Sequence, residues 1–218
     1  MEFQKDHIYH IYNQGNNRRE IFFERENYLF FLKKIKTYVS PYVDILAWCL
    51  MPNHFHLMVL VKELSLELPN SQGLTQSQAL TGQSQALTNR SLNNSIGIML
   101  RSYTRAINKQ EKLSGSLFRK NTKAECITCP EGIAPSWFME NGITTFINLL
   151  PEDDYPQVCF NYIHNNPVKA KLVKKADEWE FSSAMDYTGL RNGQLINKKT
   201  AIEFGLIKSG LDLKSNPD

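Results

Sequence analysis

Residues 43–61 read VDILAWCLMPNHFHLMVLV, and this stretch decides how the chain folds. Residues 43–51 are apolar enough for a buried strand, and Pro52-Asn53 supplies a turn. A second strand follows at once, because alternate residues after the turn are apolar: Phe55, Leu57, Val59 and Val61. Two strands joined by so short a turn form an antiparallel hairpin, so an antiparallel sheet is predicted.

Further elements flank this hairpin. Residues 7–12 alternate in polarity and end at Asn13-Gln14-Gly15, which predicts a strand closed by a turn. Apolar residues recur at helical spacing over 28–39, where Pro41 prevents continuation, and again over 92–107. Both stretches are therefore predicted to be helices that pack one side against the sheet.

The second half of the chain completes the pattern. Residues 116–127 are expected to contain another strand, and residues 130–151 are predicted to be irregular. A last helix is predicted to begin near Asp153-Asp154, with Pro156 in its first turn, and to end at Asn166-Pro167. The order strand, helix, strand, strand, helix, strand, helix predicts an α+β fold, an antiparallel sheet with helices packed on it.

The composition is that of an ordinary globular protein. The 218 residues are 42% hydrophobic and 22% charged, which suits one well-buried domain with appendages. The N-terminus lacks an apolar signal core and no apolar run is long enough to span a membrane, so we expect a cytoplasmic protein without membrane contact. The cysteines are then expected to be reduced, and the lone Cys126-Ile127-Thr128-Cys129 motif to be structural or incidental.

Two segments stand apart from this core. At about 65–90 the sequence becomes polar and repeats Gln-Ser-Gln-Ala-Leu-Thr at 76–81 and 83–88, which indicates a low-complexity loop inserted at the surface. Residues 1–187 are expected to form the main domain. Residues 188–218 form a C-terminal extension of unknown role, which packs on the sheet or contacts a ligand.

Positive charge is concentrated in one part of the chain. The net charge is only +3, yet seven basic residues and one acid lie between Arg101 and Lys123. The predicted helix over 92–107 places Arg101, Arg105 and Lys109 opposite its apolar stripe. This stretch either binds a polyanion such as a DNA backbone or forms a solvated helix face followed by a loop.

Four polar residues are candidates for chemistry. His54 and His56 are two residues apart on a predicted strand, so both point to one face and can chelate a divalent ion. The alternative is a pair of half-buried histidines with ordinary hydrogen bonds. Tyr162 and Asn166 are four residues apart on a predicted helix and therefore share one face of it. A tyrosine in that position either packs in the core with its hydroxyl reaching water or takes part in chemistry.

Five strings of sequence, in order, resemble one protein family. Residues 51–57 (MPNHFHL) look like the histidine–hydrophobic–histidine motif of the HUH nucleases. Residues 162–168 (YIHNNPV) resemble the tyrosine helix of one branch, the REP-associated tyrosine transposases, which are related to small single-tyrosine insertion-sequence transposases. Residues 9–17, 114–119 and 179–183 resemble other segments of that family. The resemblance covers roughly residues 7–187.

The resemblance implies a ferredoxin-like sheet and a set of roles. His54 and His56 would hold Mg²⁺ or Mn²⁺, and Tyr162 would be the nucleophile. Asn166 matches the position of a polar third ligand, which is often glutamine in relatives. The implied substrate is single-stranded DNA beside a hairpin, in the family a repetitive extragenic palindrome. Phosphate contacts would come from Arg101, Arg105, Lys109, Arg119 and Lys120.

The implied reaction is metal-dependent strand cleavage and transfer through a covalent 5′-phosphotyrosine. Three alternatives stay open: a DNA-binding module without catalysis, a metallohydrolase that needs no tyrosine, and a plain scaffold with structural histidines. Some related transposases act as homodimers with shared sites, while the REP-associated branch need not.

Overall fold

Four strands form one antiparallel sheet in the order β2-β3-β1-β6. The computed structural model describes residues 1–69, 87–129, 137–140, 143–146 and 155–207. The strands of the sheet are β1 (Ile8–Gln14), β2 (Val43–Met51), β3 (His54–Val61) and β6 (Lys123–Cys126). Helix α1 (Arg25–Tyr38) connects β1 to β2, and α2 (Leu92–Gln110) lies between β3 and β6. This is the predicted ferredoxin-like α+β arrangement, and the prediction is confirmed.

The remaining described elements are short or lie outside the sheet. They are η1 (Asn16–Arg18), β4 (Ser65–Pro69), β5 (Leu87–Ser91), β7 (Trp137–Glu140), β8 (Ile143–Phe146), α3 (Tyr155–Lys169), η3 (Ala176–Glu178), α4 (Ala184–Tyr187) and α5 (Lys198–Glu203). Strands β4 and β5 pair into a ribbon at the base of the predicted surface loop, and residues 70–86 lie outside the described part. No described helix is both long enough and apolar enough to cross a membrane.

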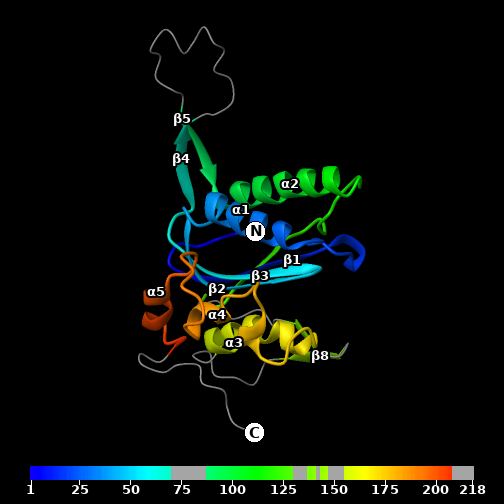
Figure 1. Ribbon diagram of the computed structural model, residues 1–218. Coiled ribbons are helices and arrows are strands. Elements are labelled where there is room, and N and C mark those ends of the chain that lie inside the picture. The colour runs from blue at the N-terminus through cyan, green and yellow to red at the C-terminus, as the bar shows by residue number, and fades with distance from the viewer. Residues whose placement is uncertain (70–86, 130–136, 141–142, 147–154, 208–218) are drawn as a thin grey trace.

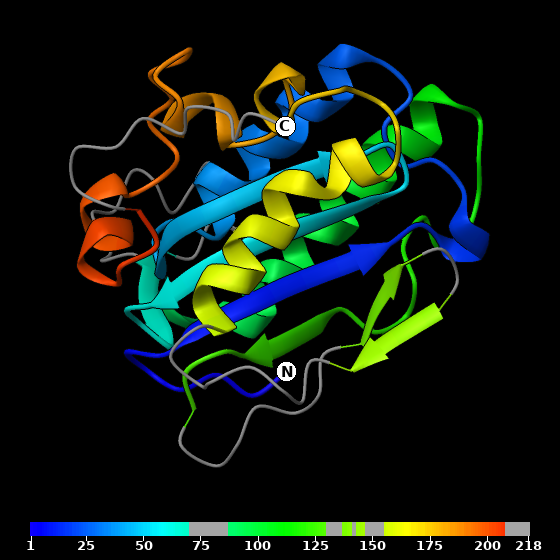
Figure 2. The ribbon, with the colours of Figure 1, turned by 90° about the horizontal axis from the view of Figure 1, so that it is seen from below.

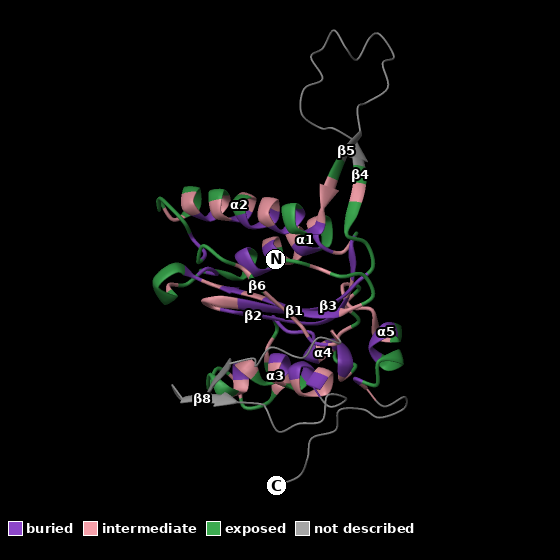
Figure 3. Cartoon of the chain, turned by 180° about the vertical axis from the view of Figure 1, so that it is seen from behind, coloured by how far each residue is buried: buried purple, intermediate pink, exposed green. Residues whose placement is uncertain are grey.

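The sheet has a helical layer on each face. Helices α1 and α2 cover one face, and α3 with α4 covers the other (Figure 1). Figure 2, seen from below, shows α3 lying across the sheet, and α3 contacts β2 and β3. The helices turn their buried sides toward the strands and their exposed sides outward (Figure 3).

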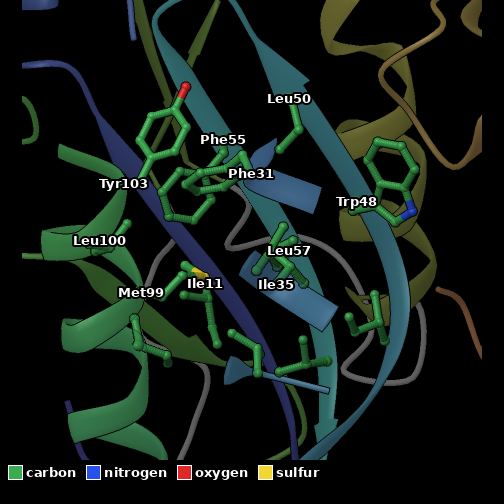
Figure 4. Close-up of a cluster of buried hydrophobic side chains, with 14 of the residues drawn as sticks. Ile11, Phe31, Ile35, Trp48, Leu50, Phe55, Leu57, Met99, Leu100 and Tyr103 are labelled. Carbon is green, nitrogen blue, oxygen red and sulfur yellow. The ribbon is translucent and has the colours of Figure 1, made fainter. Parts of the chain in front are cut away.

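The larger core lies between the sheet and helices α1 and α2. The stripe predicted on α2 is buried, and Tyr103 packs edge-on against Phe31 of α1 with ring centroids 4.9 Å apart. Phe31 is fully buried and also contacts Phe55 of β3 (Figure 4). Burying one such ring contributes about 1.5–3 kcal/mol, so this cluster fixes which face of β3 points inward. Phe55, Leu57 and Val59 take that face, which leaves the histidines for the other.

The end of β1 is held close to the hairpin turn. The Gly15 amide donates to the Asn53 carbonyl at 2.8 Å, and the Arg119 amide donates to the Gln14 carbonyl at 2.9 Å. A side chain at position 15 would collide with the Arg19 carbonyl, so glycine is needed there. The turn of residues 13–15, the hairpin turn and residues 117–119 are therefore gathered at one end of the sheet.

The outer edge of β2 is covered by the C-terminal part of the chain. The Leu50 amide donates to the Phe181 carbonyl at 2.8 Å, and the Asn197 amide donates to the Ile45 carbonyl at 2.8 Å. Helix α5 follows, with Ala201 buried against this side. Residues 188–207 thus pack beside the sheet, and residues 208–218 lie outside the described part.

Three local predictions were wrong. Helix α3 continues past Pro167 to Lys169, because proline removes only one donor and the next amides bond onward, with Ala170 donating to the Asn166 carbonyl. Within 130–151, predicted to be irregular, β7 and β8 pair as a hairpin, while 130–136, 141–142 and 147–151 lie outside the described part. Cys126 and Cys129 are disulfide-bonded rather than reduced, since the turn after β6 brings their Cα atoms to 5.7 Å.

Candidate active site

The two candidate histidines begin β3, directly after the hairpin turn. The imidazole rings of His54 and His56 lie with centroids 5.0 Å apart and planes at 86°. In the register of the sheet, Gln14 of β1 stands opposite His54, and Tyr12 stands opposite His56. Residues paired across antiparallel strands point to the same face. All four side chains therefore share the face that α3 covers.

A third histidine, His10, contacts His56 of this pair. His10 of β1 is 4% exposed, and its Nε2 lies 2.8 Å from Nδ1 of His56. The two rings stack at 5.0 Å. One of the two nitrogens must carry the hydrogen. When His56 donates from Nδ1, its Nε2 keeps a lone pair, which is the state a metal ligand needs.

The neighbouring Asn53 holds His54 in the corresponding tautomer, with the hydrogen on Nδ1. Its Nδ1 lies 2.6 Å from Oδ1 of Asn53 in the hairpin turn. An amide oxygen only accepts, so the hydrogen sits on Nδ1 and Nε2 keeps its lone pair. Second-shell hydrogen bonds of this kind orient metal-binding histidines in known sites. Both rings of the pair are thus fixed by local partners.

The residues present fit a divalent metal. Nε2 of His56 is buried and has no hydrogen-bond partner among the described atoms. Leaving such a group unsatisfied costs about 1–3 kcal/mol, which a bound ion would offset. Burial lowers the pKa of His54, and burial together with the neighbouring His10 and His54 lowers the pKa of His56. Both imidazoles are therefore neutral near neutral pH, which is the form that could ligate a metal.

Helix α3 brings the other two candidates over the histidines. The ring of Tyr162 meets that of His56 edge-on, with centroids 5.5 Å apart. Asn166, one turn later, hydrogen-bonds with the side chains of both His54 and Tyr162. Its Nδ2 also donates to the Tyr162 carbonyl at 3.1 Å. The structure therefore brings together Tyr162, Asn166, His54 and His56, the four residues singled out in the sequence.

A buried hydrogen-bond chain holds α3 in place. Nε2 of His164 lies 2.7 Å from Oγ of Ser183, and that oxygen also accepts from the Trp48 amide of β2 at 2.9 Å. Burial lowers the pKa of His164 to about 3, so its imidazole is neutral. The neutral link ties the middle of α3 to the sheet, which sets the height of Tyr162 above the histidines.

The environment of the tyrosine favours the phenol over the phenolate. Burial raises the pKa of Tyr162, and the hydrogen bond with Asn166 works in the opposite direction. Nζ of Lys169 lies 5.7 Å from the centre of the same ring. A second tyrosine, Tyr12, lines the same pocket, but its hydroxyl donates to Glu125 at 2.6 Å. The two tyrosines thus have different partners in one site.

A basic groove leads into this site. The pocket that contains the histidines and Tyr162 has a volume of about 440 Å³ and is also lined by Arg119 and Lys123. A neighbouring hollow of about 450 Å³ beside α2 contains Arg101, Arg105, Arg119 and Lys120. The two share Asn13 and Arg119, and neither is lined by an acid. Lys109, also predicted to contact phosphate, is exposed on α2 and lines neither.

Two groups at the site were not predicted from the sequence. His10 was predicted only as part of a strand. The register of β1 against β3, had it been known, would have placed His10 beside His56. Lys123 was counted as part of the basic stretch but not as a contact. Register brings it opposite Tyr12, beside the histidines.

The fold and site define a class of architecture, a ferredoxin-like antiparallel sheet with a helix that carries Tyr162 and Asn166 across one face. The chain is similar to a solved structure of a REP-associated tyrosine transposase bound to a REP hairpin, with 16% sequence identity and a TM-score of 0.51. The similarity covers 87% of this chain and 83% of that one. No family model matches the sequence, and no curated protein matches it.

Proposed function

We propose that the protein cleaves and rejoins single-stranded DNA through a covalent link to Tyr162. The observation that carries this proposal is the convergence of Tyr162, Asn166, His54 and His56 in one pocket at the end of a basic groove, where Nε2 of His56 has no partner among the described atoms. The fold neighbour is a transposase bound to a DNA hairpin, which supports DNA as the ligand class.

The pair His54 and His56, with the Asn166 amide as third ligand, would hold Mg²⁺ or Mn²⁺. When bound, such an ion supplies positive charge that neutralises a phosphate and polarises it as a Lewis acid. The amide oxygen is the kind of ligand that these ions prefer, and the DNA phosphate and water would supply further oxygens beside the two imidazoles. Asn53 and His10 would keep the two ligand nitrogens aimed at the pocket.

Tyr162 would attack the phosphorus of a phosphodiester held above the histidines. The bond from phosphorus to the 3′ oxygen breaks, a 5′-phosphotyrosine ester forms, and the phenol proton is lost while the 3′ oxygen gains one. The ester keeps the energy of the broken bond, so a 3′ hydroxyl can reverse the step and join another strand. Because the phenol is the stable form in this pocket, positioning of the phosphate contributes much of the rate.

The single strand would reach Tyr162 along the groove of Arg101, Arg105 and Arg119. Guanidinium groups there contact phosphates and so set the position of the strand without reading its bases. Lys123 would hold the phosphate next to the one that reacts. Target choice would then come from the hairpin beside the single strand, as in the family that the sequence resembles.

The test is a covalent-trapping gel. Labelled single-stranded DNA carrying hairpins is mixed with the protein and Mn²⁺ and resolved under denaturing conditions. The expected slow band is present in wild type and Tyr12→Phe, and absent in Tyr162→Phe, in His54→Ala with His56→Ala, and with chelator. Specific binding with no band in wild type would favour a DNA-binding module without catalysis. Cleavage that survives Tyr162→Phe would favour a metallohydrolase.

A further inference from the structure

A second cluster of metal-binding side chains lies at the opposite end of β1 and β6. Cys126 ends β6, Cys129 follows in the next turn, and His7 precedes β1. One ligand atom from each of the three residues lies within 4.8 Å of the others. All three are half-buried. His7 and Cys126 are 119 residues apart in the sequence, so the sequence alone offered no reason to group them.

Hydrogen bonds hold the turn of 126–129 against the start of β1. The Ile127 amide donates to the Ile8 carbonyl at 2.7 Å, and the Ile8 amide donates to Oγ1 of Thr128 at 2.9 Å. Nδ1 of His7 lies 3.1 Å from the Thr128 carbonyl. A carbonyl only accepts, so the hydrogen sits on Nδ1 and Nε2 keeps its lone pair. This is the second-shell arrangement of metal-binding histidines.

We propose that the reduced protein binds one thiophilic divalent cation, of the class of Zn²⁺, through Cys126, Cys129 and His7. Two thiolates spaced C-x-x-C and one imidazole are ligands that Zn²⁺ prefers, and three protein ligands leave a fourth position for water. The Tyr9 hydroxyl, 3.8 Å from Sγ of Cys129, can stabilise the thiolate as a donor. Magnesium and manganese favour oxygen ligands, so this cluster and the histidine pocket select different ions.

The oxidation state of the cysteines decides whether the cation binds. The two sulfurs are joined in this structure, and a disulfide offers no thiolate. A dithiol reductant supplies two electrons and two protons, becomes a disulfide itself, and leaves two thiols. Binding of the cation then releases both protons to solvent. In either state the cluster cross-links the turn after β6, but only the reduced state holds a metal.

The inference does not depend on the proposed DNA chemistry. Its ligands share no residue with the pocket of His54, His56 and Tyr162. To keep the two sites apart, the experiment uses full-length protein with His54→Ala and His56→Ala as the parent. Co²⁺ replaces Zn²⁺ as the probe, because thiolate ligation gives a charge-transfer band in the near ultraviolet that imidazole ligation alone does not.

The parent protein is reduced with a phosphine, which adds no competing thiol, and titrated with Co²⁺ and then Zn²⁺. We expect a charge-transfer band that saturates at one equivalent and disappears as Zn²⁺ displaces Co²⁺. Oxidised parent gives no band. Cys126→Ser with Cys129→Ser abolishes it, whereas Cys159→Ala, which removes a buried thiol elsewhere, leaves it intact.

His7→Gln provides a variant that keeps both cysteines. Loss of this ligand is expected to weaken Co²⁺ binding at least about tenfold. Circular dichroism checks that each variant is folded. Absence of the band in reduced, folded parent would overturn the proposal, and so would a band that survives the double serine substitution. Unchanged affinity in His7→Gln would remove His7 from the site and refute the three-ligand assignment.

Discussion

Replacing His10 by phenylalanine tests how the histidine pair is organised. The substitution keeps a ring in the same buried position but removes Nε2, the only described partner of His56 Nδ1. His56 then loses the hydrogen bond that orients its ring and that, when His56 is the donor, keeps the hydrogen on Nδ1 and off Nε2. The ligand nitrogen no longer has a single state, although no residue of the pocket itself has been changed.

The expected loss of metal affinity follows from known second-shell effects. Removing such a partner weakens metal binding by about tenfold to a hundredfold, equivalent to about 1.4–2.7 kcal/mol. Mn²⁺ affinity, measured by the electron paramagnetic resonance signal of the free ion, should fall by that factor in His10→Phe. His10→Gln places an amide oxygen near the former Nε2 and should recover most of the affinity, since the oxygen accepts from His56 Nδ1.

A control separates this effect from general destabilisation. Tyr103→Phe removes a buried hydrogen bond, from the hydroxyl to the Ile21 carbonyl at 2.7 Å, on the other face of the sheet. It should lower stability by about 1 kcal/mol and leave Mn²⁺ affinity unchanged. Wild-type Mn²⁺ affinity in folded His10→Phe, in an assay where His56→Ala abolishes binding, would refute the reasoning.

Three further predictions follow from the groove, the helix link and the core. Arg101→Ala with Arg105→Ala should reduce the salt dependence of single-strand binding by about 1.4 in the slope of log K against log salt, whereas Lys109→Ala should leave it near wild type, as measured by fluorescence anisotropy. The pKa of His164 is about 3 in the folded protein, against its ordinary value of 6.5 in the unfolded chain, so the unfolded chain binds a proton that the folded chain does not. The free energy of unfolding should therefore fall as pH drops below 6.5, at up to about 1.4 kcal/mol per pH unit, and His164→Gln should remove that part of the slope in urea titrations at pH 7 and pH 5. Phe31→Ala should cost about 3–5 kcal/mol in the same titrations at pH 7, because Phe31 is fully buried against four other rings.

The sequence predicts most of the fold because its strong signals are local. Alternation in residues 54–61 places the histidines on one face, and the short Pro52-Asn53 turn fixes the hairpin. The end of α3 was missed for a physical reason. Pro167 removes one donor near the end of a helix, where few hydrogen bonds remain to be lost, so the rule that proline ends a helix did not hold.

The parts of the site that escaped prediction depend on register between distant strands. His10 meets His56 only because β1 and β3 pair with Tyr12 opposite His56. Lys123 reaches the pocket because β6 pairs with β1 on the other side. Cys126 and Cys129 were interpreted as structural or incidental because the sequence has no second cysteine pair near them. In space, however, they lie beside a third possible metal ligand, His7, near the start of the chain.

The most direct test of the central claim identifies the residue that carries the DNA. Protein reacted with hairpin-bearing single-stranded DNA and Mn²⁺ is digested with nuclease and protease, and the modified peptide is sequenced by mass spectrometry. We predict a nucleotide joined through its 5′ phosphate to Tyr162 and not to Tyr12, with a free 3′ hydroxyl on the released fragment. An adduct on Tyr12, or cleaved DNA with no modified tyrosine, would contradict the account.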